Sequence, residues 1–207
     1  MSNEVKEPFV REDNQVQSVK DTRRAETDYS FKTERLRMRR FTLEDAMDVT
    51  NICNNYNVHK STLSLPYPYP VECAVDWISK QEDWFANEVR YEFAVCDKVT
   101  GTLYGIIGLS HDKTNQNGEC GYLMGESYWG KGYGTEALQA IIQFAFTTKN
   151  YHKVWARHFA SNPASGRMMQ KVGMNYEGTQ VDQVVKNDKF ETLVYYGIVS
   201  KKDGTMG

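Results

Sequence analysis

The sequence has little excess charge of either sign. Its 25 Lys and Arg residues nearly balance 27 Asp and Glu residues, which gives a formal net charge of -2 and a pI near 6.1. No whole-molecule positive field therefore recruits nucleic acid or an anionic membrane. The densest basic stretch, residues 32–40, alternates arginines with Leu36 and Met38, as a strand with one solvated face does. We expect no nucleic-acid partner.

Long apolar runs and paired cysteines are also missing. No stretch approaches the roughly 20 apolar residues that a membrane helix needs, and residues 1–10 lack the apolar segment of a secretory signal. The four cysteines are scattered without a CxxC pair, which favours reduced core residues over disulfides. The four histidines have no metal-ligand spacing with one another or with the cysteines. These absences predict a cytoplasmic protein with no membrane contact and no metal.

The N-terminal segment differs from the rest of the chain. Residues 1–28 mix acidic and basic side chains with no sustained apolar period, which predicts a disordered tail. A regulatory or partner-binding tail is the alternative. A chain of 207 residues suits one well-buried core, so residues 29–207 are expected to form a single domain.

Apolar periodicity predicts a mixed α/β (α+β) domain built around one sheet. Strands are expected near 36–38, over 91–96, 103–110, 119–124 and 154–160, and as a terminal pair ending at 198. Helices are expected after a capping-box-like start at 42–45 and over 71–88, 138–146 and 163–171. The strands between 91 and 124 follow one another through short turns, which predicts an antiparallel meander. Three prolines within 66–70 exclude regular helix or central strand there and predict a stiff aromatic loop.

The most informative stretch joins the strand at 119–124 to the next helix. Gly130, Gly132 and Gly134 stand just before an amphipathic run. Glycine removes the Cβ barrier to positive φ, and converging N–H groups at a helix N-terminus form a cradle for a phosphate or pyrophosphate. A tight turn without a ligand is the alternative. The spacing fits neither a P-loop, which needs Ser or Thr where Gly132 stands, nor a dinucleotide fingerprint.

Four segments resemble one protein family. Residues 129–137, Trp-Gly-Lys-Gly-Tyr-Gly-Thr-Glu-Ala, resemble the pyrophosphate-binding motif of the GNAT superfamily of acetyl-CoA-dependent acetyltransferases. Residues 162–174 resemble the helix after strand five in the branch that acetylates ribosomal-protein N-termini, at alanine or serine, and residues 65–69 and 118–122 match that branch in order and spacing. The resemblance implies the GNAT fold, with a central, mostly antiparallel, twisted sheet of about seven strands. Strands four and five, here 119–124 and 154–160, would splay apart, and about four helices would flank the sheet.

The resemblance also implies acetyl-CoA as the cofactor and assigns residues to it. The pantetheine arm would bond along the strand that ends at Met124, the pyrophosphate would lie on the amides of residues 131–135, and Asn162 would hold the arm near the thioester. The family's usual Gln or Arg at the start of the glycine motif is Trp129 here. The implied cofactor-binding residues are Leu123, Met124, Trp129, Gly130, Lys131, Gly132, Tyr133, Gly134, Thr135, Asn162 and Ser165.

Acetyl transfer needs a neutral amine and a proton for the departing thiolate. By resemblance, Glu119 faces the acceptor and acts as the base, through a water molecule; a solvated turn glutamate is the alternative. Many GNAT enzymes place a tyrosine acid seven residues beyond the position of Asn162, but Met169 stands there. Ser165, which this branch uses as the acid, takes that role in our interpretation, unless it only bonds to the helix start.

The acceptor is expected to be a primary amine: a protein N-terminal α-amine, or a small molecule such as a polyamine or antibiotic. Tyr67, Tyr69 and Trp77 either line its slot or belong to the core. His111 and His158 are further candidate bases, because histidine titrates near neutrality. A non-catalytic acyl-CoA-binding or regulatory module is the alternative function. We expect a monomer or a homodimer.

Overall fold

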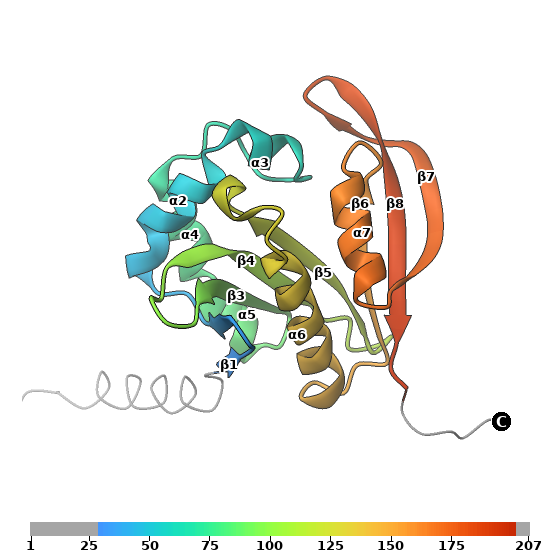
Figure 1. The fold of residues 1–207 in the computed structure, drawn as a ribbon, viewed down its shortest axis with the longest axis horizontal. Coiled ribbons are helices and arrows are strands. Elements are labelled where there is room, and N and C mark those ends of the chain that lie inside the picture. The colour runs from blue at the N-terminus through green and yellow to red at the C-terminus, as the bar shows by residue number, and fades with distance from the viewer. Residues whose placement is uncertain (1–28, 202–207) are drawn as a thin grey trace, which may run out of the picture.

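Across residues 29–201, which are the residues the structure describes, eight strands form one sheet (Figure 1). The structure is a computed structural model. The predicted tail, residues 1–28, lies outside the described residues, as do residues 202–207. The strand order is β1-β2-β3-β4-β5-β6-β8-β7. The strands are β1 Phe31–Lys32, β2 Leu36–Arg39, β3 Arg90–Asp97, β4 Leu103–Ser110, β5 Asn117–Met124, β6 Lys153–Phe159, β7 Asn175–Lys186 and β8 Lys189–Val199.

Each strand from β2 to β5 pairs antiparallel with the next one in this series, which confirms the predicted meander over β3 to β5. Side chains of β3 alternate between the two faces of the sheet. Tyr91, Phe93 and Val95 enter one buried cluster. Ala94 and Cys96 enter a second cluster on the other face. Because both faces are covered, β3 is a nearly continuous apolar run rather than a half-polar one.

Strands β5 and β6 are parallel neighbours only where they begin. Their register pairs residues 117–119 with residues 153–155. Beyond these pairs β5 continues to Met124 and β6 continues to Phe159, so the two strands diverge. The edge of β5 that faces β6 therefore has no strand partner past Glu119, and its backbone groups are available to a ligand. The predicted splay is confirmed.

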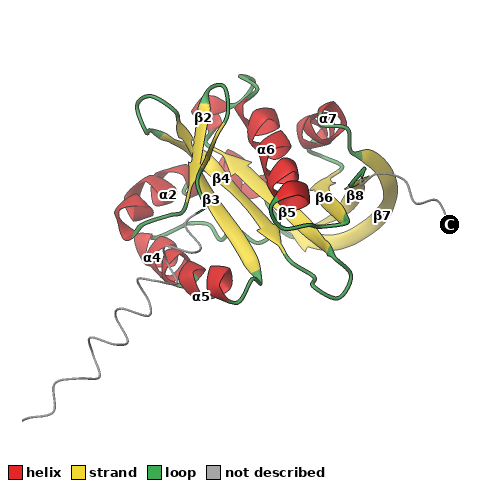
Figure 2. Ribbon diagram, turned by 90° about the horizontal axis from the view of Figure 1, so that it is seen from below, coloured by secondary structure: helices red, strands yellow, loops and turns green. Residues whose placement is uncertain are grey.

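Helices cover both faces of the sheet (Figure 2). Helices α6 and α7 lie on one face over the first cluster, which includes Leu138, Ile141 and Met169. Helices α2 and α4 lie on the other face over the second cluster, which includes Val49 and Ala74. The helices are α2 Ala46–Cys53, α3 Tyr56–Lys60, α4 Val71–Ser79, α5 Gln81–Ala86, α6 Tyr133–Thr147 and α7 Pro163–Lys171.

Some helix boundaries match the prediction and others do not. Helix α7 has the predicted bounds, with Asn162 at the N-cap. The helix predicted over 71–88 is two helices that meet at Lys80. Ile78 and Phe85 are seven residues apart, so in one straight helix they would lie on the same face. The break at Lys80 lets Ile78 pack in the second cluster and Phe85 in the first. Helix α3 was not predicted, because its five residues are too short for an apolar period; the Asn55 side chain caps it.

The predicted capping box at 42–45 is present. The Thr42 backbone N–H donates to Asp45 Oδ2 at 2.8 Å, and a short 3₁₀ helix, Leu43–Asp45, leads into α2. Asp45 is buried, and its Oδ1 forms an ion pair with Arg39 Nη2 at 2.7 Å. Burial by itself raises the pKa of Asp45, but the bonds from Arg39 and Thr42 outweigh it and hold that pKa below its usual value.

The hairpin of β7 and β8 reaches back to the N-terminal half of the chain (Figure 1). At its tip, Asn187 Oδ1 lies 2.9 Å from Nε2 of His59 in α3. The neighbouring Lys186 Nζ donates to the backbone O of Leu65 at 3.3 Å. Burial lowers the pKa of Lys186. The tip of the hairpin thus contacts both α3 and the aromatic loop that follows α3 in the sequence.

Within residues 29–201 no helix is long and apolar enough to cross a membrane. All four cysteines are free thiols: Cys53, Cys96 and Cys120 are buried, and Cys73 is half-buried. Burial raises the pKa of the Cys53 thiol to about 12. The prediction that the cysteines are core residues is confirmed for the three buried ones.

Candidate active site

The glycine loop has the backbone geometry of an anion cradle. Gly130 and Gly132 adopt φ values of 73° and 83°, which an L side chain rarely adopts. Gly132 is the N-cap of α6, a helix of 15 residues that begins at Tyr133. The first amides of a helix have no partner inside it and carry a partial positive charge. The loop therefore suits a phosphate group.

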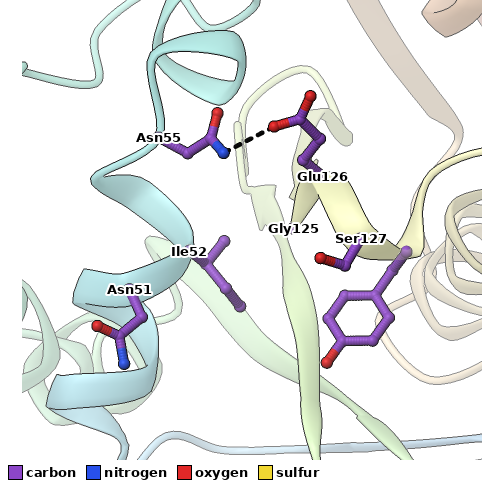
Figure 3. Close-up of a pocket in the computed structure, with 7 residues that line it drawn as sticks. Asn51, Ile52, Asn55, Gly125, Glu126 and Ser127 are labelled. Carbon is purple, nitrogen blue, oxygen red and sulfur yellow. Dashed lines mark hydrogen bonds between the residues drawn. The ribbon is translucent and has the colours of Figure 1, made fainter.

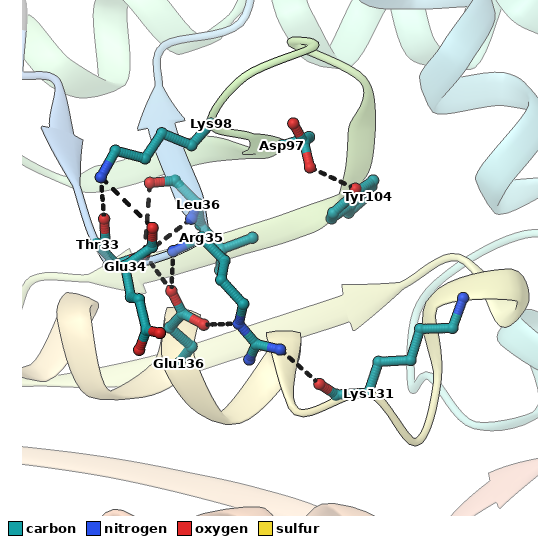
Figure 4. A network of polar contacts seen from close by, with 9 residues as sticks. All are labelled: Thr33, Glu34, Arg35, Leu36, Asp97, Lys98, Tyr104, Lys131 and Glu136. Atoms are coloured by element: carbon teal, nitrogen blue, oxygen red, sulfur yellow. Dashed lines mark hydrogen bonds and ion pairs between the residues drawn. The ribbon is translucent and has the colours of Figure 1, made fainter.

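An arginine 96 positions earlier in the sequence, Arg35, holds this loop (Figure 4). Arg35 Nε donates to Glu136 Oε2 and the Arg35 backbone N–H donates to Glu136 Oε1, both at 2.8 Å. Arg35 Nη1 donates to the backbone O of Lys131 at 3.0 Å, and the guanidinium lies 4.7 Å from the ring centre of Tyr133. The sequence analysis missed this role, because Arg35 stands in a stretch that it interpreted as a solvated strand face.

The other residues assigned to the cofactor surround the end of β5. Trp129 Nε1 donates to the backbone O of Met124 at 2.7 Å, which fixes an indole that stays 43% exposed. Leu123 packs against the second cluster and Met124 belongs to the first. Gly134 is buried in the first turn of α6, where a Cβ would stand 2.6 Å from Met168 Cε of α7. The glycine therefore lets the two helices pack closely.

Helix α7 presents its first turn to β5 across the gap. Asn162 is the N-cap residue, yet its side chain makes no capping hydrogen bond, so the amide stays available to a ligand. Ser165 Oγ lies 2.6 Å from Tyr122 Oη of β5. Burial raises the pKa of Tyr122, so its phenol is protonated near neutral pH. The sequence analysis missed Tyr122, whose partner stands 43 residues away.

Glu119 lies at the point where β5 and β6 separate, in the last residue pair between them. Its Oε1 accepts from Arg157 Nε of β6 at 2.9 Å, and its side chain is 30% exposed. Its backbone N–H donates to Ser110 Oγ at 2.8 Å. Burial by itself lowers the pKa of Arg157, but hydrogen bonds to Tyr195 and Glu119 outweigh it and raise that pKa. Glu119 is therefore an ion-paired carboxylate that solvent still reaches.

The two polar pairs lie on opposite faces of the sheet. Cys120 points into the first cluster, so its neighbour Glu119 points to the face of α2 and α4. Tyr122 packs against the first cluster, on the face of α6 and α7. The gap between β5 and β6 is thus bridged by Glu119 and Arg157 on one face and by Tyr122 and Ser165 on the other. The structure brings both predicted catalytic residues to the same gap.

The three aromatic residues assigned to the acceptor slot differ in burial. Tyr67 is 47% exposed, and its ring centre lies 5.3 Å from that of His59. Tyr69 is buried in the second cluster, and Trp77 packs edge-on against Phe41 at 5.0 Å. Tyr69 and Trp77 thus have the positions of core residues, whereas Tyr67 offers a surface.

A hollow of about 320 Å³ lies between α2 and the turn after β5 (Figure 3). Glu126 stands in its wall, with Oε2 accepting from Asn55 Nδ2 and Oε1 accepting from Asn57 Nδ2, each at 2.8 Å. Among residues 29–201, no basic side chain lines the hollow; its lining residues there are Asn51, Ile52, Asn55, Gly125, Glu126, Ser127 and Tyr128. A carboxylate in such a wall attracts a cation.

The two candidate histidine bases have structural contacts. His111 stacks on Tyr151 at 4.5 Å, and burial lowers the pKa of its imidazole. His158 Nδ1 lies 2.7 Å from the backbone O of Phe159, and its Nε2 is buried without a hydrogen-bond partner in the described residues. In residues 29–201, no three His, Cys, Asp or Glu side chains gather in a way that holds a metal ion.

Comparisons with known proteins agree on one family. The model of the acetyltransferase (GNAT) domain matches residues 35–175. The uncharacterised N-acetyltransferase p20 of Bacillus licheniformis is 30% identical over 147 residues, which are 70% of this chain and 82% of that protein.

Two solved structures share the fold. The ribosomal-protein-S5-alanine acetyltransferase of Vibrio fischeri superposes with a TM-score of 0.76 at 20% identity, covering 84% of this chain and 98% of that one. The spermidine N-acetyltransferase of Vibrio cholerae, solved with CoA and spermine, superposes with a TM-score of 0.72 at 20% identity, covering 82% and 98%.

Proposed function

The chain belongs to the GNAT family of acetyl-CoA-dependent acetyltransferases, and on that premise we propose that it acetylates the α-amine of a protein N-terminus. The observation that carries the proposal is the ion pair of Glu119 with Arg157 beside the gap. An α-amine with a pKa near 7.8 costs only about 1 kcal/mol to deprotonate at pH 7, whereas a lysine-like amine near 10.4 costs about 4.6 kcal/mol. A carboxylate already engaged by arginine suits the less demanding acceptor.

Acetyl-CoA supplies the activated acetyl group, and the residues of the gap fit it. The amides of residues 131–135 would hold the pyrophosphate, with the positive φ values of Gly130 and Gly132 supporting that shape. The edge of β5 at Leu123 and Met124, which has no strand partner toward β6, would bond the pantetheine arm through backbone groups other than the Met124 carbonyl, which Trp129 occupies. The uncapped amide of Asn162 would bond the same arm. Trp129 would border the phosphates through its indole rather than through a charged side chain.

Two residues would assist the acetyl transfer, one at the amine and one at the departing sulfur. Glu119 accepts the proton of the attacking amine through a water molecule, because solvent reaches its carboxylate. Ser165 donates a hydrogen bond to the sulfur as the carbon–sulfur bond breaks, which stabilises the developing negative charge. Tyr67 would border the entering peptide, since its ring is exposed at the aromatic loop; Tyr69 and Trp77 would support that loop from the core.

A small polyamine is the second candidate acceptor. The hollow beside β5 has the Glu126 carboxylate in its wall and no basic lining residue, which favours a cationic molecule. The Vibrio cholerae relative named for spermidine has the same fold. We further propose that the protein is a monomer or a homodimer. We also propose that it lies in the cytoplasm, because free thiols are typical of that compartment.

The test is thiol release from acetyl-CoA with N-terminal Ser and Ala peptides, polyamines and aminoglycosides as acceptors. We expect the peptides to raise turnover most, and Glu119→Gln to lower kcat/KM on the order of 100-fold with unchanged CoA affinity. Arg157→Gln is the matched control, because it breaks the same ion pair and keeps the carboxylate. If kcat/KM fell equally in Glu119→Gln and Arg157→Gln, Glu119 would only brace the site through its ion pair. If only polyamines were acetylated, the proposed peptide acceptor would be wrong. CoA binding without turnover of any acceptor would favour a non-catalytic acyl-CoA-binding module.

A further inference from the structure

The contact between Tyr122 and Ser165 is short and crosses the gap. Tyr122 Oη lies 2.6 Å from Ser165 Oγ and 3.4 Å from the backbone O of the same residue. Either hydroxyl can be the donor to the other. Within the described part of the chain, Tyr122 Oη is the one hydrogen-bond partner of Ser165 Oγ. The phenol therefore decides where the serine proton points.

The direction of this hydrogen bond follows from acidity. A phenol is a stronger acid than an aliphatic hydroxyl and is the better donor of the two. Burial raises the pKa of Tyr122, so the phenol proton is present at every pH near neutrality. When Tyr122 donates, Ser165 keeps its own proton for a different acceptor, and a hydroxyl that accepts one bond donates a stronger one.

The phenol does not pass its proton onward to sulfur. A cysteine thiol has a pKa of about 8.5 and the alkyl thiol of CoA a higher one, still not above the value of about 10 for a free phenol. Burial raises the pKa of Tyr122 further, so the thiolate is too weak a base to pull that proton through the serine. What the pair offers the departing sulfur is an aligned chain of two donors. Met169, the residue of α7 at the position of the usual tyrosine acid, is buried in the core and has no such proton.

We propose that Tyr122 is a positioning residue for the leaving group: its phenol donates to Ser165 Oγ and directs the Ser165 hydroxyl proton toward the sulfur of CoA. The inference rests on the role proposed above for Ser165. The competing explanation is that Tyr122 only braces β5 against α7 across the gap, since the same bond joins these two elements.

The experiment compares Tyr122→Phe, Ser165→Ala and the double variant with Tyr151→Phe. Tyr151 is the matched control, because it is fully buried and its hydroxyl donates to the backbone O of Ser110 at 3.0 Å. Calorimetry measures the Kd of CoA and of an analogue with hydrogen in place of the thiol, at neutral pH and at an alkaline pH of about 9.5, because the alkyl thiol of CoA is a weaker acid than a cysteine thiol of pKa about 8.5. Steady-state kinetics gives kcat for each variant.

We expect Tyr122→Phe and Ser165→Ala each to raise the Kd of CoA about 3- to 10-fold more than the Kd of the analogue, which is the range of one lost hydrogen bond. Tyr151→Phe should leave that ratio unchanged. Tyr122→Phe should lower kcat about tenfold in the wild-type background and not at all in Ser165→Ala, because Tyr122 acts through the serine.

The inference would be overturned if Tyr122→Phe raised the Kd of CoA and of the analogue equally, or if the double variant had a lower kcat than Ser165→Ala. Either result would show that Tyr122 only braces β5 against α7. If Ser165→Ala changes neither the ratio nor kcat, the proposed role of Ser165 fails and the inference fails with it. Acetyl transfer itself is judged separately, from the turnover of the wild type with its acceptor.

Discussion

Replacing Gly132 with alanine tests whether the glycine loop binds the phosphates of CoA. Gly132 has a φ of +83°, and a Cβ there would stand 3.3 Å from Arg35 Nη2. Gly101, in the turn between β3 and β4, is a matched control, with a φ of +76° and nothing within 4 Å of an added Cβ. The two substitutions add the same methyl group to the same kind of backbone conformation, at different distances from the candidate site.

The backbone conformation, which is left-handed at both glycines, sets the expected magnitudes. An alanine in the left-handed region costs about 1–2 kcal/mol, and restricting the unfolded chain returns about 0.4–1 kcal/mol. Each variant should therefore lose about 1 kcal/mol in its free energy of unfolding. In Gly132→Ala the loop relieves this strain by moving its amides, and one lost bond to a charged phosphate costs about 1.5–3 kcal/mol. The Kd of CoA should rise about 10- to 100-fold.

Chemical denaturation measures the stability of the two variants, and calorimetry with CoA measures the affinity. We expect similar stability losses in both and weaker CoA binding in Gly132→Ala alone. If Gly132→Ala binds CoA as tightly as Gly101→Ala, the loop amides do not bind the cofactor and the reasoning from backbone geometry is refuted.

Two further predictions concern the supports of the site and of the fold. Arg35→Ala removes the ion pair with Glu136 that holds the loop and should raise the Kd of CoA about fivefold, measured by calorimetry; an unchanged Kd would show that the loop holds its shape alone. Asp45→Asn breaks a bidentate contact with Arg39 and should lower the free energy of unfolding by about 2 kcal/mol near pH 7, the range of a lost hydrogen bond between charged groups. Because folding lowers the pKa of Asp45, its contribution is complete above the unfolded pKa of about 3.9 and is lost as pH falls through the folded pKa. The difference between the two proteins in denaturant titrations should therefore shrink in acid, and a difference that grows there would contradict the assignment.

The local elements could be predicted from the sequence because their causes are local. The antiparallel meander of β3 to β5 with its short turns, the bounds of α7 and the glycine loop before α6 each depend on residues within a few positions of one another. Turn chemistry, capping residues and apolar period act over that range. The resemblance of residues 129–137 then indicated the family, which the domain match confirmed.

The tertiary structure alone decided which of these elements meet. Only the pairing of β5 with β6 over residues 117–119 opens the gap, and only the position of α7 brings Ser165 to Tyr122. Arg35 contacts Glu136 across 101 positions of sequence, and no local pattern distinguishes it from the neighbouring arginines at 37, 39 and 40. Such contacts depend on strand directions and helix placement, because the free energy that fixes them comes from the burial of two separate apolar clusters.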